Sequence, residues 1–398
     1  MPSVSTGRFP APVLAEEFLE KKIDTPTERW DDLKWGEHAH AFTVAHSNEA
    51  AVLDAIQGLL NKAMREGVGF QSFRKGMLDM MKEKGWYGGA GHTGDEKRYI
   101  NWRVKTIYET NMRTAYAQAQ YRKQVQGAGL RPIWVYQSQL SGNNRRQEHL
   151  ALHGKAYRYD DAFWDRYYPP NGWGCRCYVT TKSEAGAERE GITAGDSTTE
   201  TLPDIDGTWA YNAGREALAP NFAKYTNLPK ETLKQIYAKY HRSMDGTRMT
   251  EGEFKTLITR TAEADYKPLN VNYQVGNLEA GRFEAMRRFG VRDSKIMATD
   301  HDLWHGTDDK NAKRKIPKEL FNEVYQTLQE PEMIYRAKKS KDTIKEIHFV
   351  KKLGKNKVLK IVLKAWFNKE KETYTALRVI TMGVVENNYG DTVYEKIW

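Results

Sequence analysis

The chain has 398 residues, of which 39% are hydrophobic and 12% aromatic, and its formal net charge is +10. This apolar content supports real hydrophobic cores and excludes global disorder, while the length allows two or three domains of roughly 100–200 residues. The chain shows neither the ~20 consecutive apolar residues of a membrane span nor a secretory signal, so we expect a soluble, non-secreted protein. The positive charge suggests anionic partners such as nucleic acid or an acidic protein surface, although a merely solubilising surface would give the same composition.

Helical periodicity dominates the first 125 residues. An amphipathic helix comes first, over the stretch LAEEFLEKKI. Residues 47–84 predict two further helices, because apolar residues recur at helical spacing and a glycine follows each helix. A glycine-rich break precedes a long helix from about residue 100 to 125, and residues 131–140 then alternate like a strand.

The middle of the chain, residues 141–183, is rich in turns and gathers the residues most capable of chemistry. The candidate metal ligands are His149, His153, Cys175 and Cys177. The histidines are four residues apart, so a helix here would put both imidazoles on one face. Two ring nitrogens and two thiolates would then satisfy a tetrahedral structural zinc ion, although the Cys-x-Cys spacing is shorter than the usual Cys-x2-Cys.

The two cysteines allow other interpretations. A disulfide between them is disfavoured, because Cys-x-Cys closes a strained ring and cytoplasmic-type chains rarely carry structural disulfides. Nothing in the sequence marks either thiol as an activated nucleophile. The remaining alternative to zinc is that His149 caps or hydrogen-bonds a loop while the cysteines are small buried hydrophobes. The Pro-Pro-Asn-Gly turn before the cysteines would bring them back toward the His149 segment.

The last part of the chain changes character. Residues 184–208 predict a loop or linker, residues 223–262 helices, and residues 263–300 a mixed connector. Residues 317–331 predict a helix with proline at its first position and just past its end. Three strand-like runs follow, at 343–353, 357–367 and 372–385, with turns at 354–356 and 368–371. Alternating basic and apolar residues in these runs are typical of an antiparallel sheet with one buried face.

The predicted fold class is therefore α+β. A mainly helical N-terminal domain with a turn-rich Cys-x-Cys block is linked to a small C-terminal domain of helix plus antiparallel sheet. The predicted domain ranges are 1–222, a helical connector at 223–294, and 295–398.

Three stretches carry a resemblance to a known family: YETNMRTAYAQAQYR, RRQEHLALHGKAYRYDDAFWDRYYPPNGWGCRC and DGTWAYNAGREAL. They resemble the signatures of the phage Mu protein F-like minor head proteins, also called head morphogenesis proteins. The resemblance covers about residues 12–220, and its Cys-Arg-Cys block is highly specific. His153 departs from the pattern, since an aspartate is expected there at least as often, and this puts the fourth zinc ligand in doubt.

The resemblance implies a virion component of a Mu-like phage or prophage. Such a protein acts in procapsid assembly or DNA packaging near the portal, through protein contacts rather than chemistry. The implied partners are the portal and the major capsid or scaffold proteins, and the implied location is the virion and, during assembly, the bacterial cytoplasm. The basic charge fits contact with packaged DNA.

The C-terminal stretch from DHDLWHGTDDKNAKRK through the three strands is similar to nuclease-like domains fused to phage head proteins, of the barnase–colicin–RelE superfamily of metal-independent RNases. The similarity covers roughly residues 295–398. It implies the catalytic residues His305, Lys310, Lys313, Arg378 and Thr381. The implied nucleic-acid-binding residues are Arg314, Lys315, Lys338 and Lys339.

The implied chemistry is physically reasonable. Histidine transfers protons near neutral pH, and lysines before the helix at 317–330 would bind phosphate at its positive end. His301 and His348 are spare candidates, and packing is the better role for His348 because apolar residues flank it. The alternatives are a solvated basic loop with His305 as a cap, giving a non-catalytic adaptor that binds nucleic acid or capsid, and a virion-loaded RNase toxin or effector that cleaves host RNA.

Overall fold

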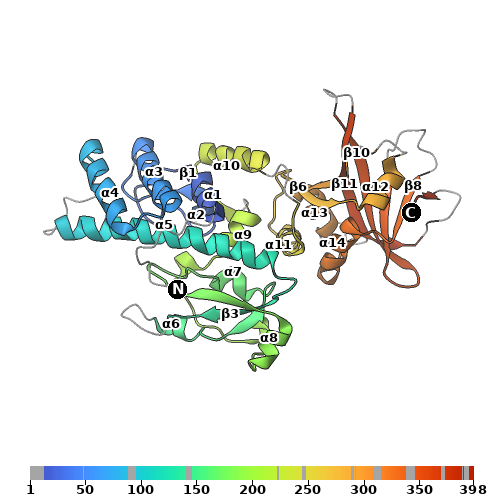
Figure 1. Ribbon diagram of the computed structural model, residues 1–398, viewed down its shortest axis with the longest axis horizontal. Helices are drawn as coiled ribbons and strands as arrows, with labels where there is room; N and C mark the ends of the chain where they lie inside the picture. Colours follow the sequence, from blue (N-terminus) through green and yellow to red (C-terminus); the bar gives the residue numbers. More distant parts are fainter. Residues whose placement is uncertain are drawn as a thin grey trace. The chain divides into compact units, whose positions relative to one another are not determined.

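The computed structural model describes residues 13–47, 49–87, 96–139, 146–221, 224–243, 248–287, 291, 293–308, 315–337, 346–368, 373–387, 389 and 394–398. The chain forms two compact units (Figure 1). The first comprises Met1–Pro220 with Tyr225–Ile236, and the second Asn221–Lys224 with Tyr237–Trp398. The three predicted domain ranges stay a prediction.

The first unit begins with a helical core. Its main helices are α1 (Val13–Lys21), α3 (Ala50–Glu66), α4 (Phe70–Lys84) and α5 (Glu96–Gln126). Figure 1 shows α5 running along the base of α3 and α4, and α1 also contacts it. The predicted helices are confirmed, and α3 and α4 end where Gly67 and Gly85 take left-handed backbone conformations, with φ of 64° and 65°. Apolar residues at helical spacing, such as Leu53, Ile56 and Met77, are completely buried between the helices.

A small antiparallel sheet with the order β4-β3-β5 forms the second part of this unit. Its strands are β3 (Ile133–Gln137), which confirms the predicted strand, β4 (Ala156–Arg158) and β5 (Tyr178–Lys182). Trp134 and Tyr136 of β3 are fully buried beside Tyr157, Phe163 and Trp164, so large rings make up most of this core.

Short elements complete the first unit. They are β1 (Ile23–Asp24), α2 (Glu37–His40), β2 (Ala41–Phe42), α6 (Gln147–Leu150), α7 (Phe163–Tyr167), α8 (Glu184–Arg189), α9 (Ala213–Leu218) and the 3-10 turns Ser197–Thr199 and Gly207–Trp209. The predicted linker at 184–208 thus contains a helix. The Ser183 side chain starts this helix by accepting a hydrogen bond from the Gly186 N–H.

The second unit contains a seven-stranded sheet with the order β12-β8-β9-β10-β11-β7-β6. The strands are β6 (Asn272–Asn277), β7 (Lys295–Thr299), β8 (Met333–Ala337), β9 (Ile347–Lys352), β10 (Lys357–Asn368), β11 (Thr373–Glu386) and β12 (Tyr394–Lys396). The three predicted strands correspond to β9, β10 and β11, which pair antiparallel, and β11 pairs parallel with β7. The predicted turn at 354–356 joins β9 to β10, whereas the one at 368–371 falls almost entirely outside the described residues.

The helices of this unit are α11 (Glu251–Thr261), α12 (Ala280–Arg287), α13 (Asp300–Thr307) and α14 (Phe321–Gln329), with a 3-10 turn at Lys318–Leu320. Helix α10 (Lys230–Ser243) is divided between the units, because its residues up to Ile236 belong to the first. Helices α10 and α11 confirm the helices predicted within 223–262. Helix α13 packs on β11 and β7, and α14 packs on β6, β9 and β10. The fold is thus mixed helix and sheet, as predicted. None of the helices in the described ranges is long and apolar enough to cross a membrane.

The predicted mixed connector is held to this sheet by a buried carboxylate. The Asp300 side chain is 1% exposed and accepts hydrogen bonds from Tyr266 Oη at 2.8 Å, Leu269 N at 2.7 Å and Val271 N at 2.8 Å. These bonds hold in place the segment that leads into β6, which is an edge strand of the sheet. Such contacts join residues about 30 positions apart, so local sequence patterns do not reveal them.

Helix α9 approaches α5 closely because Gly214 has no side chain. A Cβ atom at this position would lie 2.5 Å from Tyr121 Cβ, far inside van der Waals contact.

We predict that Gly214→Ala lowers the free energy of unfolding by about 1–3 kcal/mol, because α9 must move away from α5. Urea denaturation followed by circular dichroism measures the change. Gly129→Ala is the matched control, since its Cβ would meet nothing within 4 Å, and equal losses in the two variants would contradict the explanation.

Candidate functional site

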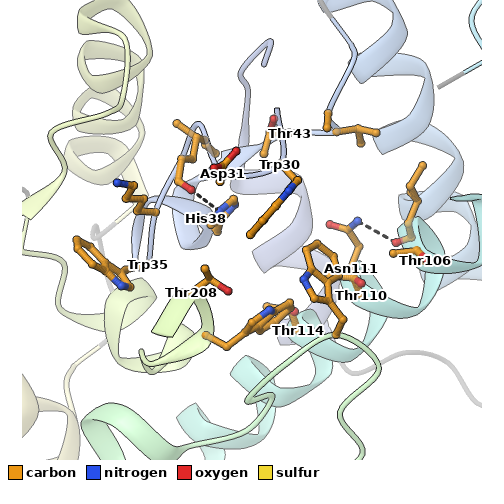
Figure 2. Close-up of a pocket in the computed structure, with 18 of the residues that line it drawn as sticks. Trp30, Asp31, Trp35, His38, Thr43, Thr106, Thr110, Asn111, Thr114 and Thr208 are labelled. Carbon is orange, nitrogen blue, oxygen red and sulfur yellow. Dashed lines mark hydrogen bonds between the residues drawn. The ribbon is translucent and has the colours of Figure 1, made fainter. Parts of the chain in front are cut away.

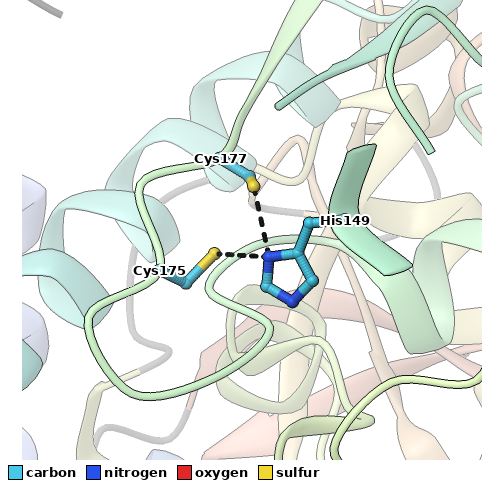
Figure 3. Close-up of side chains that lie close together, drawn as sticks. All are labelled: His149, Cys175 and Cys177. Carbon is cyan, nitrogen blue, oxygen red and sulfur yellow. Dashed lines mark hydrogen bonds between the residues drawn. The ribbon is translucent and has the colours of Figure 1, made fainter. Parts of the chain in front are cut away.

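Three of the four predicted metal ligands meet in the first unit. His149 lies on α6, and Cys175 and Cys177 lie on the loop that leads into β5 (Figure 3). His149 Nδ1 is 3.8 Å from Cys175 Sγ and 3.5 Å from Cys177 Sγ, and the three ligand atoms all lie within 4.8 Å of one another. All three side chains are buried. The structure therefore brings together residues 26 and 28 positions apart, as the predicted turn required.

The orientation of His149 is set by Asn171. His149 Nε2 lies 3.2 Å from the Asn171 carbonyl oxygen, which can only accept a hydrogen bond, so Nε2 carries the proton. Nδ1 is then the ring nitrogen with a free lone pair, and it faces both sulfurs. Metal-binding histidines are commonly oriented in this way, by a hydrogen bond from the other ring nitrogen.

Asn171 is itself rigidly held. It is fully buried, and its Nδ2 donates to Tyr136 Oη at 3.0 Å and to the Tyr167 carbonyl at 2.8 Å. The sequence showed this residue only as part of a Pro-Pro-Asn-Gly turn, and its role in orienting His149 was missed. The only sequence signal for this role was the position of Asn171, a polar residue between two prolines and the cysteine pair.

The two thiols influence each other's ionisation. The hydrogen bond between them lowers the pKa of Cys177 against the effect of burial, and a hydrogen bond with the Tyr136 hydroxyl lowers it further. The same bond, together with burial, raises the pKa of Cys175. The thiolate is the form of cysteine that binds metals, and the cluster favours it at Cys177.

The geometry fits a tetrahedral zinc ion. Zinc–sulfur bonds of about 2.3 Å and zinc–nitrogen bonds of about 2.0–2.1 Å place nitrogen and sulfur ligands about 3.6 Å apart. The two nitrogen–sulfur distances here, 3.5 and 3.8 Å, lie close to that value.

His153, the fourth predicted ligand, lies apart from the cluster. Helix α6 ends at Leu150, so no continuous helix carries both histidines. The His153 side chain is exposed, and its Nδ1 accepts a hydrogen bond from the Ser138 N–H at 3.2 Å. Ser138 Oγ lies 3.8 Å from Cys177 Sγ. Within the described ranges, no fourth histidine, cysteine or carboxylate joins these three ligands.

The predicted tail residues fall only partly within the described structure. Lys310, Lys313, Arg314, Lys338 and Lys339 lie outside it. Lys315 is described and partly buried. His305 is exposed on α13, and Arg378 and Thr381 lie on β11, the strand against which α13 packs.

The contact between α13 and β11 is close. A Cβ on Gly306, the residue after His305, would lie 2.5 Å from Met382 Cγ of β11. Arg378 Nε is 3.6 Å from Oδ2 of the nearly buried Asp302, so a carboxylate already compensates this guanidinium charge. The structure thus brings the two elements together but pairs Arg378 with a neighbour inside the protein.

The spare histidines differ in environment. His301 and His305 have ring centroids 6.3 Å apart on α13. His348 is 3% exposed, and its Nδ1 lies 3.0 Å from Tyr389 Oη. Burial, together with the charge of Lys360, lowers the pKa of His348 to about 4, so the ring is neutral at pH 7. This burial supports the predicted packing role.

Comparison with known proteins agrees with the resemblance seen in the sequence. Residues 54–180 match the family described as Phage Mu protein F like protein. The chain resembles the F proteins of Mu-like phages. The Mu-like prophage FluMu F protein of Haemophilus influenzae is 40% identical over 168 residues, which is 42% of this chain and 40% of that protein. The chain therefore matches less than half the length of this relative.

A second relative covers more of the chain. "Putative capsid assembly protein F" of Escherichia phage Mu is 29% identical over 340 residues, 74% of this chain and 76% of that protein. No solved structure matches the chain. The family match includes the whole His149–Cys175–Cys177 cluster and ends at residue 180, so the nuclease resemblance of residues 295–398 stays a prediction.

Proposed function

We propose that this protein is a minor head protein of a Mu-like phage or prophage and acts in procapsid assembly near the portal. The observation that carries the proposal is the similarity to the capsid assembly protein F of phage Mu over about three quarters of both chains. The family match over residues 54–180 also supports it.

The proposed mode of action is binding to other head proteins. The portal and the major capsid or scaffold proteins are the proposed partners, and the net charge of +10 suits contact with packaged DNA. Cys175 and Cys177 are 6% and 8% exposed, which suits a structural tie better than a site open to substrate.

The assembly role can be tested by deleting the gene in an inducible phage or prophage. We expect the titre of infectious particles to fall to background and electron microscopy to show few DNA-filled heads. Expression of the wild-type protein from a plasmid is the control and should restore both. Normal yields of filled heads after deletion would overturn the proposal.

We further propose that His149, Cys175 and Cys177 hold one structural zinc ion. The ion would tie α6 to the loop before β5, while a water molecule or Ser138 would occupy the fourth position. The matching nitrogen–sulfur distances and the hydrogen bond from His149 Nε2 to Asn171 support this proposal.

Elemental analysis of the purified protein should find about one zinc per chain. Cys175→Ser and His149→Gln should reduce zinc to trace levels and lower the melting temperature. His153→Gln is the matched control and should keep both zinc and stability, because this ring lies apart from the cluster. Zinc-free wild-type protein after dialysis against zinc would contradict the site, and zinc loss in His153→Gln would restore the four-ligand prediction.

A metal-independent RNase in the second unit is the second candidate function. The packing of α13, which carries His305, against the strand that carries Arg378 and Thr381 favours it. A virion-loaded RNase toxin or effector would use the same residues, whereas a non-catalytic adaptor would only bind nucleic acid.

The full chain should cleave RNA or tRNA in EDTA if this candidate is correct, and His305→Ala should abolish cleavage. His301→Ala is the control, since it removes a neighbouring ring from the same helix. Lack of cleavage by a folded protein would end the RNase hypothesis. Salt-sensitive binding without turnover would instead identify an adaptor.

A further inference from the structure

A cavity of about 710 Å³ opens in the first unit, and none of the three residues of the His–Cys cluster lines it. The lining segments are residues 30–45, residues 102–114 of α5, and residues 207–211, together with Lys22 and Trp173 (Figure 2). This volume lies within the roughly 300–1,000 Å³ typical of ligand pockets.

Four half-exposed tryptophans surround the cavity. Trp30, Trp35, Trp102 and Trp173 are 50%, 48%, 56% and 42% exposed. Soluble proteins rarely leave such large rings gathered around one opening unless the surface binds something.

Several of these rings are held in place before any ligand arrives. Trp35 Nε1 donates to the Gly207 carbonyl at 3.0 Å, and Arg146 donates to the Trp173 carbonyl at 2.6 Å. Trp173 packs nearly perpendicular to Trp209, with an interplanar angle of 82°, and to Trp30, at 79°. A preorganised wall loses little conformational entropy on binding.

The charges at the cavity are mostly positive. Lys22 is 7% exposed, and burial lowers its pKa to about 7. Lys34 and Arg103 also line the cavity, whereas the one carboxylate among its lining residues, all of them described, is Asp31. Asp31 already binds Arg29 Nε at 2.9 Å. The cavity is therefore complementary to an anionic group carried on an apolar body.

One wall can pair with a peptide backbone. Thr106, Thr110 and Thr114 recur every four residues along α5, so they share one face of the helix, and all three line the cavity (Figure 2). The Thr106 hydroxyl already donates to the Trp102 carbonyl at 2.9 Å and can still accept a hydrogen bond, as a threonine hydroxyl carries two acceptor lone pairs that a peptide N–H can use.

We propose that this cavity docks a short segment of an acidic head protein, with a large apolar side chain between the tryptophans and a neighbouring carboxylate toward Lys22 and Arg103. The proposal rests on the proposed function in head assembly. Perpendicular rings enclose a compact side chain, whereas single-stranded nucleic acid uses a continuous cationic track with rings on which successive bases stack. The geometry therefore favours a protein segment over nucleic acid.

The test uses the full chain and fluorescein-labelled, overlapping peptides that cover the portal, major capsid and scaffold proteins of the same phage. Fluorescence anisotropy should identify at least one binding peptide with an apolar residue beside a carboxylate. Trp30→Ala and Lys22→Met should each weaken its binding about tenfold or more. Trp398→Ala and Lys123→Met are the matched controls, because they remove an exposed tryptophan and an exposed lysine outside the cavity, and should leave binding unchanged.

Three results would overturn the docking site: no peptide binds, the Trp30 variant binds normally, or an oligo-dT strand or a second copy of the chain occupies the cavity instead. Trp30 is half exposed, so its variant keeps the test valid if Lys22→Met fails to fold. If no peptide binds but deletion of the gene still blocks head assembly, only the docking site is refuted. Normal heads after deletion would refute the assembly role.

Discussion

The burial of α5 on two sides is the constraint on which the first unit depends. Residues such as Val104 and Ala115 belong to the helical core, whereas Tyr121 and Val125 belong to the aromatic core around β3. Because a helix of 31 residues is a rigid rod, both cores and the threonine wall of the cavity share one frame. Displacing this helix would disturb all three together.

The loop that carries Cys175 and Cys177 is attached to α5 by hydrogen bonds as well as by packing. Arg113 of α5 donates to the Cys175 carbonyl at 3.3 Å, and Gln120 and Gln124 both donate to the Val179 carbonyl of β5. Trp173, on the same loop, forms part of the cavity wall. The His–Cys cluster and the tryptophan cavity are therefore parts of one supported loop, and a tie at the cluster would also stabilise the cavity.

Sequence patterns predicted the elements better than their associations. The N-terminal helices and the strands β9, β10 and β11 were predictable because apolar periodicity and glycine or proline boundaries are local signals. The sheet of the second unit is larger than predicted, since β6, β7, β8 and β12 join it. Their pairing depends on contacts between distant residues, such as those of Asp300, which no local window contains.

The sequence by itself determined the residue types of the candidate site and the resemblance of the chain to Mu F-like proteins. Both depend only on which residues are present and how they are spaced. Only the tertiary structure decided which residues meet. Helix α6 ends at Leu150, so His153 stays apart from His149, and the buried Asn171 aims the His149 ring at both thiols. The tryptophan cavity likewise has no local signature, because the rings that line it, from Trp30 to Tyr211, lie far apart in the sequence and meet only in the folded unit.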